Sequence, residues 1–322
     1  MAKAPGPLAS SSVGYEANIT MITIPLRDGT FQGESMSLSS ENADEAPKSL
    51  RWRHVPDIPD DVPVMVFTDM CLDEVLLSRA PTNIAVLIEP PALTATHYEK
   101  AVMLEDRFDA IFTYSLEHLR RGGPWRFYPY GGSRIREWGV FDKSKRANAS
   151  IIVSVKAITE GHRLRHEIVK QFGERLSVFG EPYTEYLDPK PPGLRPFRYS
   201  IVVESGRSDY YFTEKLIDCF SQGTVPIYWG CPGIDGFFDE DGIISFKTPD
   251  DLAYILASIS EWDYHDRLPA ICRNLKLARG FRCAEDHLAA EYGWLFEDSE
   301  EAAMMRAQRK EQWGALCENQ PH

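Results

Sequence analysis

Short apolar runs alternate with amphipathic segments along most of the chain, and this alternation restricts the folds that the chain can adopt. In the first half, four mostly apolar runs have the character of strands buried on both faces: 62–67, 84–89, 109–114 and 125–129. The two segments 96–108 and 115–121 between them have helical patterns, with Ser115 as an N-cap for the second. Strands that alternate with helices predict βαβ units and a parallel sheet.

A second series of the same kind follows the polar segment 141–150, which we interpret as an interdomain linker. Its expected strands are 151–155, 175–180, 199–204 and 224–230, and its expected helices are 161–173, 212–222 and 249–259. Two α/β domains in series create a crevice, and ligands of open parallel sheets bind beyond the carboxyl ends of the strands. The predicted fold class is therefore α/β, with two domains that each contain a parallel sheet.

The expected domain boundaries follow from these patterns. An N-terminal α/β domain is predicted over 46–145 and a C-terminal one over 146–263. Residues 1–45 are rich in Ser, Gly, Pro and Ala and are expected to be flexible, except for a strand-like stretch at 19–26. Residues 264–322 are expected to form a mainly helical segment with a charged end.

Composition excludes several classes of protein. The 322 residues contain 35 Lys+Arg against 48 Asp+Glu, and the formal charge of −13 argues against general binding of nucleic acid. The six cysteines form no Cys-x-x-Cys pair, and His162 and His166 have no convincing third ligand, so we expect no metal site. No apolar run approaches the roughly 20 residues of a membrane span, and the first residues lack the apolar core of a signal peptide. These features predict a cytoplasmic protein.

Residues 199–230 carry most of the predicted chemistry. A buried strand ends at Glu204, a polar loop follows, and a helix opens with Thr213, Glu214 and Lys215. The N–H groups and the positive dipole end of such a helix favour a diphosphate, and Lys215 adds a cation. Glu214 can accept hydrogen bonds from ribose hydroxyls, and Tyr211 offers a flat face to a base or a sugar. The segment is therefore typical of a nucleotide site.

This segment resembles the C-terminal signature of the α1,3/4-fucosyltransferases. The matching residues are Glu204–Ser205, 211–216 and 223–227, in the family's order and spacing. Three further stretches, 88–93, 108–132 and 165–180, are also similar to that family, so that the resemblance spans roughly 62–246. The chain departs from the family at Ser205, where the signature has Asn, so the resemblance bears on the reaction class more directly than on the sugar or the base.

The resemblance implies a GT-B architecture, in which two Rossmann-like domains face each other across a crevice, and an inverting reaction that needs no metal. It implies that Glu89, buried at the end of its strand and held by Pro90–Pro91, is the base on the acceptor side. Arg165 and Lys215 are implied as the cations for the diphosphate, with Arg163 as an alternative to Arg165. The implied donor contacts are completed by Glu214 and Tyr211 at the ribose and the base or sugar, and by Glu204 at the sugar.

The predicted function is the transfer of a sugar, with L-fucose from GDP-fucose as the favoured donor, to a hydroxyl of a glycan acceptor. A transferase of another nucleotide sugar, acting on a different polysaccharide or on modified DNA bases, is a second interpretation, and basic residues around Arg134 and Arg136 keep DNA open as an acceptor. Two interpretations of another class are a glycoside hydrolase that uses Glu89 and Glu204 as paired carboxylates and a non-catalytic protein that binds sugar nucleotides.

Overall fold

The computed structural model describes residues 21–29, 47–128, 131–139, 145–297 and 304. Its described residues divide into two compact units. We call Gly131–Arg282 the central unit, and the N-terminal unit combines the segments before Gly131 with those from Cys283 onward. Both units have an α/β fold with a parallel sheet. No helix among these residues is long and apolar enough to cross a membrane.

The N-terminal unit contains a six-stranded parallel sheet in the order β2-β1-β3-β4-β5-β6. Its strands are β1 (Ile22–Arg27), β2 (Leu50–His54), β3 (Val64–Thr68), β4 (Thr82–Val86), β5 (Ala110–Thr113) and β6 (Trp125–Phe127). Its α-helices are α1 (Pro91–Met103), α2 (Leu116–Leu119) and α7 (Ala284–Tyr292), and its 3-10 helices are η1 (Asp69–Leu77), η2 (Glu105–Arg107) and η8 (Gly293–Leu295). The apolar runs predicted as strands 62–67, 84–89, 109–114 and 125–129 correspond to β3, β4, β5 and β6.

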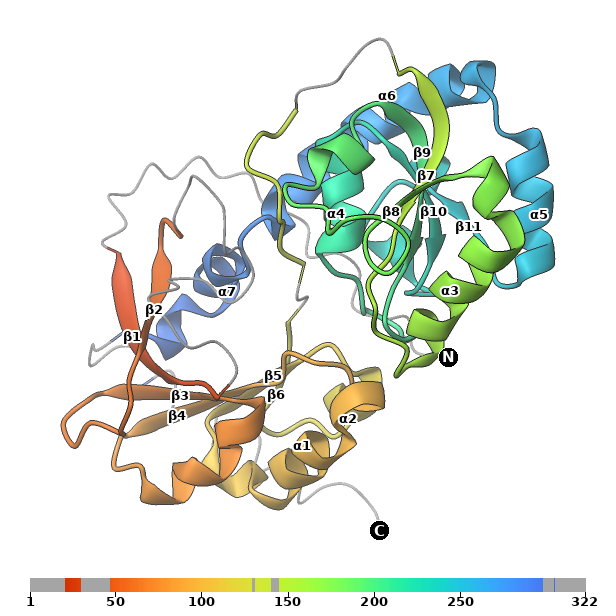
Figure 1. Ribbon diagram of the computed structural model, residues 1–322. Coiled ribbons are helices and arrows are strands. Elements are labelled where there is room, and N and C mark those ends of the chain that lie inside the picture. The colour runs from red at the N-terminus through yellow and green to blue at the C-terminus, as the bar shows by residue number, and fades with distance from the viewer. Residues whose placement is uncertain (1–20, 30–46, 129–130, 140–144, 298–303, 305–322) are drawn as a thin grey trace. The chain divides into compact units, whose positions relative to one another are not determined.

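Alternate residues of β3, β4 and β5 face two different cores. Met65 and Phe67 of β3 pack with α1 and η1, whereas Val64 and Val66 pack with residues that follow Cys283, including Leu288 of α7. Burial on both faces explains why β3 consists of apolar residues throughout its central part. Figure 1 shows α1 and α2 on one face of the sheet and α7 on the other.

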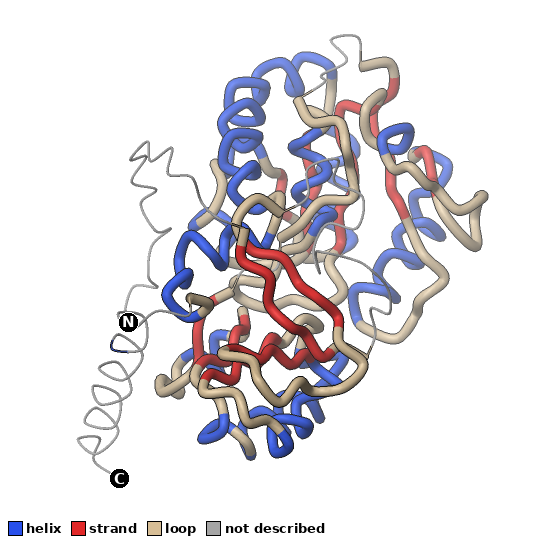
Figure 2. The backbone as a smooth tube through the Cα atoms, turned by 90° about the vertical axis from the view of Figure 1, so that its left-hand side faces the viewer, coloured by secondary structure: helices blue, strands red, loops and turns tan. Residues whose placement is uncertain are grey.

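The central unit contains a five-stranded parallel sheet in the order β11-β10-β9-β7-β8. Its strands are β7 (Ala147–Ile152), β8 (Ser177–Phe179), β9 (Phe197–Val203), β10 (Val225–Trp229) and β11 (Ile244–Ser245). Its helices are α3 (Glu160–Phe172), α4 (Glu214–Ser221), α5 (Pro249–Ser258) and α6 (Glu261–Ala278). The helices lie on both sides of the strands (Figure 2).

The strand order of the central unit indicates where a ligand site can form. From β7 the chain continues to β8 on one side, and β9 then pairs with β7 on the other side. The loops that leave β7 and β9 therefore diverge at the carboxyl ends of two adjacent strands. Such a switch point is the usual binding position in open parallel sheets.

The structure divides the chain differently from the expected boundaries at 46–145, 146–263 and 264–322. The central unit begins at Gly131, and β7 begins inside the segment 141–150 that we interpreted as a linker. The helical segment from 264 is shared between the units, because α6 packs in the central core through Ile271 and α7 in the N-terminal core. In the segment expected to be flexible, β1 pairs with β2 and β3, while residues 1–20 and 30–45 lie outside the described residues.

Candidate functional site

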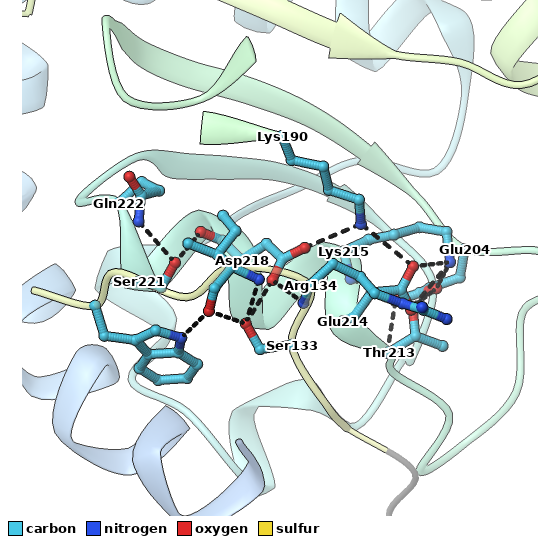
Figure 3. A network of polar contacts seen from close by, with 12 residues as sticks. Ser133, Arg134, Lys190, Glu204, Thr213, Glu214, Lys215, Asp218, Ser221 and Gln222 are labelled. Carbon is cyan, nitrogen blue, oxygen red and sulfur yellow. Dashed lines mark hydrogen bonds and ion pairs between the residues drawn. The ribbon is translucent and has the colours of Figure 1, made fainter. Parts of the chain in front are cut away.

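The first turn of α4 is fixed by a buried carboxylate. Glu204 follows β9, and its side chain is fully buried. Its carboxylate accepts hydrogen bonds from the Thr213 backbone N–H at 2.9 Å and the Thr213 hydroxyl at 2.7 Å, and the Lys215 ammonium lies 3.4 Å away (Figure 3). Thr213 is the N-cap of α4. A carboxylate beside a helix N-terminus is stabilised by the helix dipole, so Glu204 holds this turn in place.

A chain of alternating charges continues from Lys215 along α4. Glu214 Oε1 lies 3.5 Å from Lys215 Nζ and 3.6 Å from Lys190 Nζ, and Lys190 Nζ donates to Asp218 Oδ2 at 2.9 Å. The other Asp218 oxygen accepts bonds from the Ser133 hydroxyl at 2.8 Å and from a backbone N–H at 3.0 Å (Figure 3). The network thus connects the loop before β9 and the start of the central unit to α4.

Opposite charges outweigh the effect of burial at two members of the network, Glu214 and Lys190. Burial acts to raise the pKa of Glu214, but the charges of Lys215, Lys190 and Arg134 outweigh it and hold that pKa well below its usual range. Burial likewise acts to lower the pKa of Lys190, and the carboxylates of Asp218 and Glu214 raise it instead. Glu214 is therefore a carboxylate at neutral pH, able to accept hydrogen bonds from hydroxyl groups.

Arg165 reaches the same region from α3. Its side chain is only 6% exposed, its Nε donates to the Val203 carbonyl at 2.9 Å, and its Nη2 has no hydrogen-bond partner among the described residues. Burial lowers the pKa of Arg165, and the charges of Glu204 and Glu214 act in the opposite direction. A buried guanidinium with an unused N–H group is suited to binding an anion. Arg163, the alternative, is exposed and donates to the Ile158 carbonyl at 2.8 Å.

The position of Arg165 depends on a close approach between α3 and the end of β9. Gly161, in the first turn of α3, donates its N–H to the Ser205 carbonyl at 3.3 Å. A Cβ at this position would lie 1.8 Å from the Glu204 carbonyl oxygen. Only glycine permits this approach, which brings the first turn of α3 against the backbone of Glu204.

His162 belongs to the N-terminal cap of α3. It is buried, its Nδ1 accepts the backbone N–H of Thr159, and the Thr159 hydroxyl accepts the N–H of His162 in return. Burial, with the nearby charge of Arg165, lowers the pKa of His162 to about 4. Because His162 is used as a cap, it is neutral at pH 7.

The buried state of His162 predicts a loss of stability in mild acid. Since the folded pKa is depressed from 6.5 to about 4, the unfolded chain takes up the proton first as the pH falls. The contribution of His162 to the free energy of unfolding is full above pH 6.5 and decreases towards pH 4, by up to about 1.4 kcal/mol per pH unit.

Urea unfolding of the parent and of His162→Gln between pH 8 and pH 4.5 checks this prediction. Glutamine is a standard residue at this position of a capping box, so the variant retains the cap and loses only the titration. The difference in unfolding free energy between the two proteins is expected to be constant above pH 7 and to fall below pH 6.5. A difference that does not change with pH would contradict the prediction.

Two of the residues predicted to contact the donor are buried in this structure. Glu204 has no exposed surface, and its oxygens are engaged by Thr213 and Lys215, so it organises the helix start. The Tyr211 side chain is 3% exposed. The contacts of these two residues with a sugar or a base stay predictions. Arg165, Glu214 and Lys215 keep exposed or unpartnered polar groups at the site.

Glu89 lies in the N-terminal unit, three residues after the end of β4 and directly before Pro90, the N-cap of α1. Its side chain is exposed, so the expected burial at the strand end is wrong. The reason is local, because the apolar residues Leu87 and Ile88 take the buried positions that follow the strand. Within the described residues, no group of three or more His, Cys, Asp or Glu side chains is arranged to hold a metal ion.

Lys190 and Asp218 were missed by the sequence analysis. Asp218 is one helical turn after Glu214, and this spacing is a signal that places both side chains on one face of α4. Lys190 lies in a proline-rich loop without any motif, so only the folded chain shows that it joins the network.

No protein-family model matches the chain, and no curated protein matches it. Among solved structures, an α1,3-fucosyltransferase is similar at a TM-score of 0.55 and 13% identity, covering 89% of this chain and 95% of that one. A structure of α1,3-fucosyltransferase with GDP-fucose is similar at a TM-score of 0.53 and 13% identity, covering 89% of this chain and 94% of that one. The structure of Anabaena HepE in complex with UDP is similar at a TM-score of 0.56 and 10% identity, covering 84% of this chain and 99% of that one. These similarities show the fold, which is of the GT-B type, with two parallel-sheet α/β units as predicted.

Proposed function

We propose that this chain is a glycosyltransferase that moves a sugar from a nucleoside diphosphate sugar to an acceptor hydroxyl. The observation that carries the proposal is the buried guanidinium of Arg165, whose Nη2 has no partner among the described residues. It lies within electrostatic range of Glu204, the carboxylate that Lys215 contacts at the N-terminus of α4. Two cations and a helix N-terminus at the switch point of a parallel sheet suit a diphosphate.

Each residue has a role in the proposed reaction. The acceptor oxygen attacks the anomeric carbon while the bond from that carbon to the diphosphate oxygen breaks, and the diphosphate leaves with the electron pair. Glu89 takes the proton of the acceptor hydroxyl. Arg165 and Lys215 stabilise the charge that develops on the leaving group, which is the part a metal ion plays in other transferases. Glu214, held as a carboxylate, accepts hydrogen bonds from the ribose hydroxyls.

The favoured donor is GDP-fucose and the favoured acceptor a glycan. The support is the signature-like order of Glu204–Ser205, 211–216 and 223–227, together with the similarity in fold to an α1,3-fucosyltransferase that was solved with GDP-fucose. The alternative is a donor with another base, such as a UDP-sugar. It is supported by the equal similarity to HepE in complex with UDP and by Ser205, which departs from the fucosyltransferase signature.

A thermal-shift panel of GDP, UDP, CMP and their sugars tests the proposal, followed by turnover with the sugars that bind. A ligand at 100 times its dissociation constant raises the free energy of unfolding by about 2.7 kcal/mol. We expect GDP and GDP-fucose to raise the melting temperature and CMP to leave it unchanged.

The other possible results of the thermal-shift panel and the turnover assay each contradict a different part of the proposal. A response to UDP compounds alone replaces the donor and keeps the class. No response to any nucleotide overturns the class, and sugar release without a nucleotide indicates a hydrolase. Binding without turnover indicates a non-catalytic binding protein.

A further inference from the structure

The backbone of Ile88–Glu89 is held by three side chains from three different elements. Asp69, the first residue of η1, accepts the Ile88 N–H on Oδ1 at 3.1 Å. The Tyr114 hydroxyl, just after β5, donates to the Ile88 carbonyl at 3.3 Å, and the Tyr98 hydroxyl of α1 donates to the Glu89 carbonyl at 3.2 Å. We call Asp69, Tyr98 and Tyr114 the turn clamp.

The turn clamp is buried although the residue that it holds is exposed. Asp69 is 8% exposed, Tyr98 2% and Tyr114 not at all. Burying a carboxyl group and two phenol groups is costly unless each makes hydrogen bonds, and here each bonds to the backbone of the same turn. The clamp is also tied to the sheet, because the Tyr98 hydroxyl lies 3.3 Å from the Thr113 hydroxyl in β5.

An exposed glutamate in a loop needs no such support for folding. Its side chain could move with its backbone at little cost, whereas proton transfer requires a fixed position within hydrogen-bond reach of the reacting group. Three buried contacts fix the backbone on both sides of the Glu89 Cα, and Pro90 restricts the residue further. This arrangement immobilises the backbone that carries an accessible carboxylate.

We propose that Asp69, Tyr98 and Tyr114 are positioning residues that hold the Glu89 carboxylate in the orientation needed to accept the acceptor's proton. The inference rests on the proposed function, in which Glu89 is the base. It adds residues that lie outside the donor site and that act only through the backbone of the turn.

Asp69 also makes the clamp sensitive to pH. Burial raises the pKa of Asp69 to about 7, and the charges of Glu89 and Asp28 raise it, while the backbone N–H groups of Ile88 and Glu89 lower it. The other titratable group that faces it is Tyr98, whose own pKa is raised by burial and which stays a neutral phenol. The ionised carboxylate accepts N–H bonds more strongly than the acid does, so the clamp tightens as the pH rises through about 7.

The test compares Tyr98→Phe, Tyr114→Phe and Asp69→Asn with the parent, using the nucleotide sugar that the panel identifies. Loss of one hydrogen bond to the turn is expected to lower kcat about 10-fold for each Phe variant, with the KM for the donor unchanged. Asparagine keeps an acceptor for Ile88 but does not titrate, so Asp69→Asn is expected to lose the rise of kcat near pH 7.

Tyr292→Phe is the matched control. The Tyr292 hydroxyl donates to the Phe127 carbonyl at 3.0 Å in the same unit, so the variant loses the same kind of bond away from Glu89. It is expected to keep its kcat. A second control compares the single variant Glu89→Gln with the double variant Glu89→Gln/Tyr98→Phe. The two are expected to have equal kcat values, because the clamp acts only through Glu89.

The outcomes separate this inference from the proposed function. If Tyr98→Phe and Tyr114→Phe both keep the kcat of the parent, the clamp is overturned and the transferase activity stands. The same holds if Tyr292→Phe loses as much kcat as these two variants do. An additional loss from Tyr98→Phe in the Glu89→Gln background shows that Tyr98 acts by another route and also overturns it. A parent that binds no nucleotide or shows no turnover overturns both proposals. If one clamp variant does not fold, the other two decide the question.

Discussion

Replacing Arg165 with methionine is expected to weaken the binding of a nucleoside diphosphate about 100-fold and to leave the stability of the ligand-free protein nearly unchanged. A hydrogen bond to a charged group contributes about 1.5–3 kcal/mol, and about 2.7 kcal/mol corresponds to a factor of 100. In the free protein the guanidinium is buried with Nη2 unpartnered among the described residues, so its removal relieves desolvation. It costs the bond to the Val203 carbonyl and the attraction of the Glu204 and Glu214 charges. These effects offset each other to within about 1.5 kcal/mol.

Titration calorimetry with GDP and UDP, together with urea unfolding, measures the two effects of Arg165→Met separately. Arg163→Met is the matched control, because Arg163 lies on the same helix, is exposed and bonds only to the Ile158 carbonyl among the contacts described. It is expected to bind nucleotide as the parent does. If Arg165→Met lost several kcal/mol of stability and kept its affinity, Arg165 would be a structural residue and the diphosphate site would have to be placed elsewhere.

Gly161→Ala is expected to destabilise the central unit by about 3 kcal/mol, at the upper end of what overpacking costs. The new Cβ would lie 1.8 Å from the Glu204 carbonyl oxygen and 3.0 Å from that of Ser205. Both are backbone atoms at the end of a central strand, so no side chain can move aside. Either α3 or the end of β9 must shift, and either shift separates Arg165 from Glu204. Nucleotide affinity is therefore expected to fall together with stability.

Gly173→Ala at the other end of α3 is the control for this prediction. There the new Cβ would meet only the Val169 side chain at 3.6 Å, an ordinary contact, and the backbone is already in the right-handed helical region. We expect the unfolding free energy of this variant to equal that of the parent or to exceed it by up to about 1 kcal/mol. Equal urea midpoints for Gly161→Ala and the parent would show that the close approach is not needed.

Most strands and helices could be predicted because their hydrophobic periods are local. β3, β4 and β5 are mostly buried and rich in apolar residues. The Thr248 cap and the first-turn proline of α5 can also be recognised in the sequence. β2 was missed because Leu50 and Trp52 alternate with arginines in a strand of only five residues. The start of the central unit at Gly131 does not follow from the sequence, because the hydrogen bond from Ser133 to Asp218 joins residues that are 85 positions apart.

From the residues alone, the candidate site was predictable only where its residues follow one another, and Arg165 was named only through the resemblance. Thr213, Glu214 and Lys215 share a helix start, so their common location follows from the sequence. Burial depends on what packs above each residue, and the sequence does not show that Glu204 is covered or that Glu89 is exposed. Asp69 is a single aspartate after a strand, and its contact with Ile88 depends on the pairing of β3 with β4.

The return of α7 to the first sheet has a consequence for how the protein is made on the ribosome. Leu288, Leu295 and Phe296 complete the core over one face of that sheet, and Glu285 accepts the indole N–H of Trp52 at 2.8 Å. These residues are translated after the whole central unit, whose chain from Gly131 to Arg282 is continuous. The central unit can therefore fold during synthesis, whereas the sheet that was translated first keeps an apolar face open until the last part of the chain has emerged.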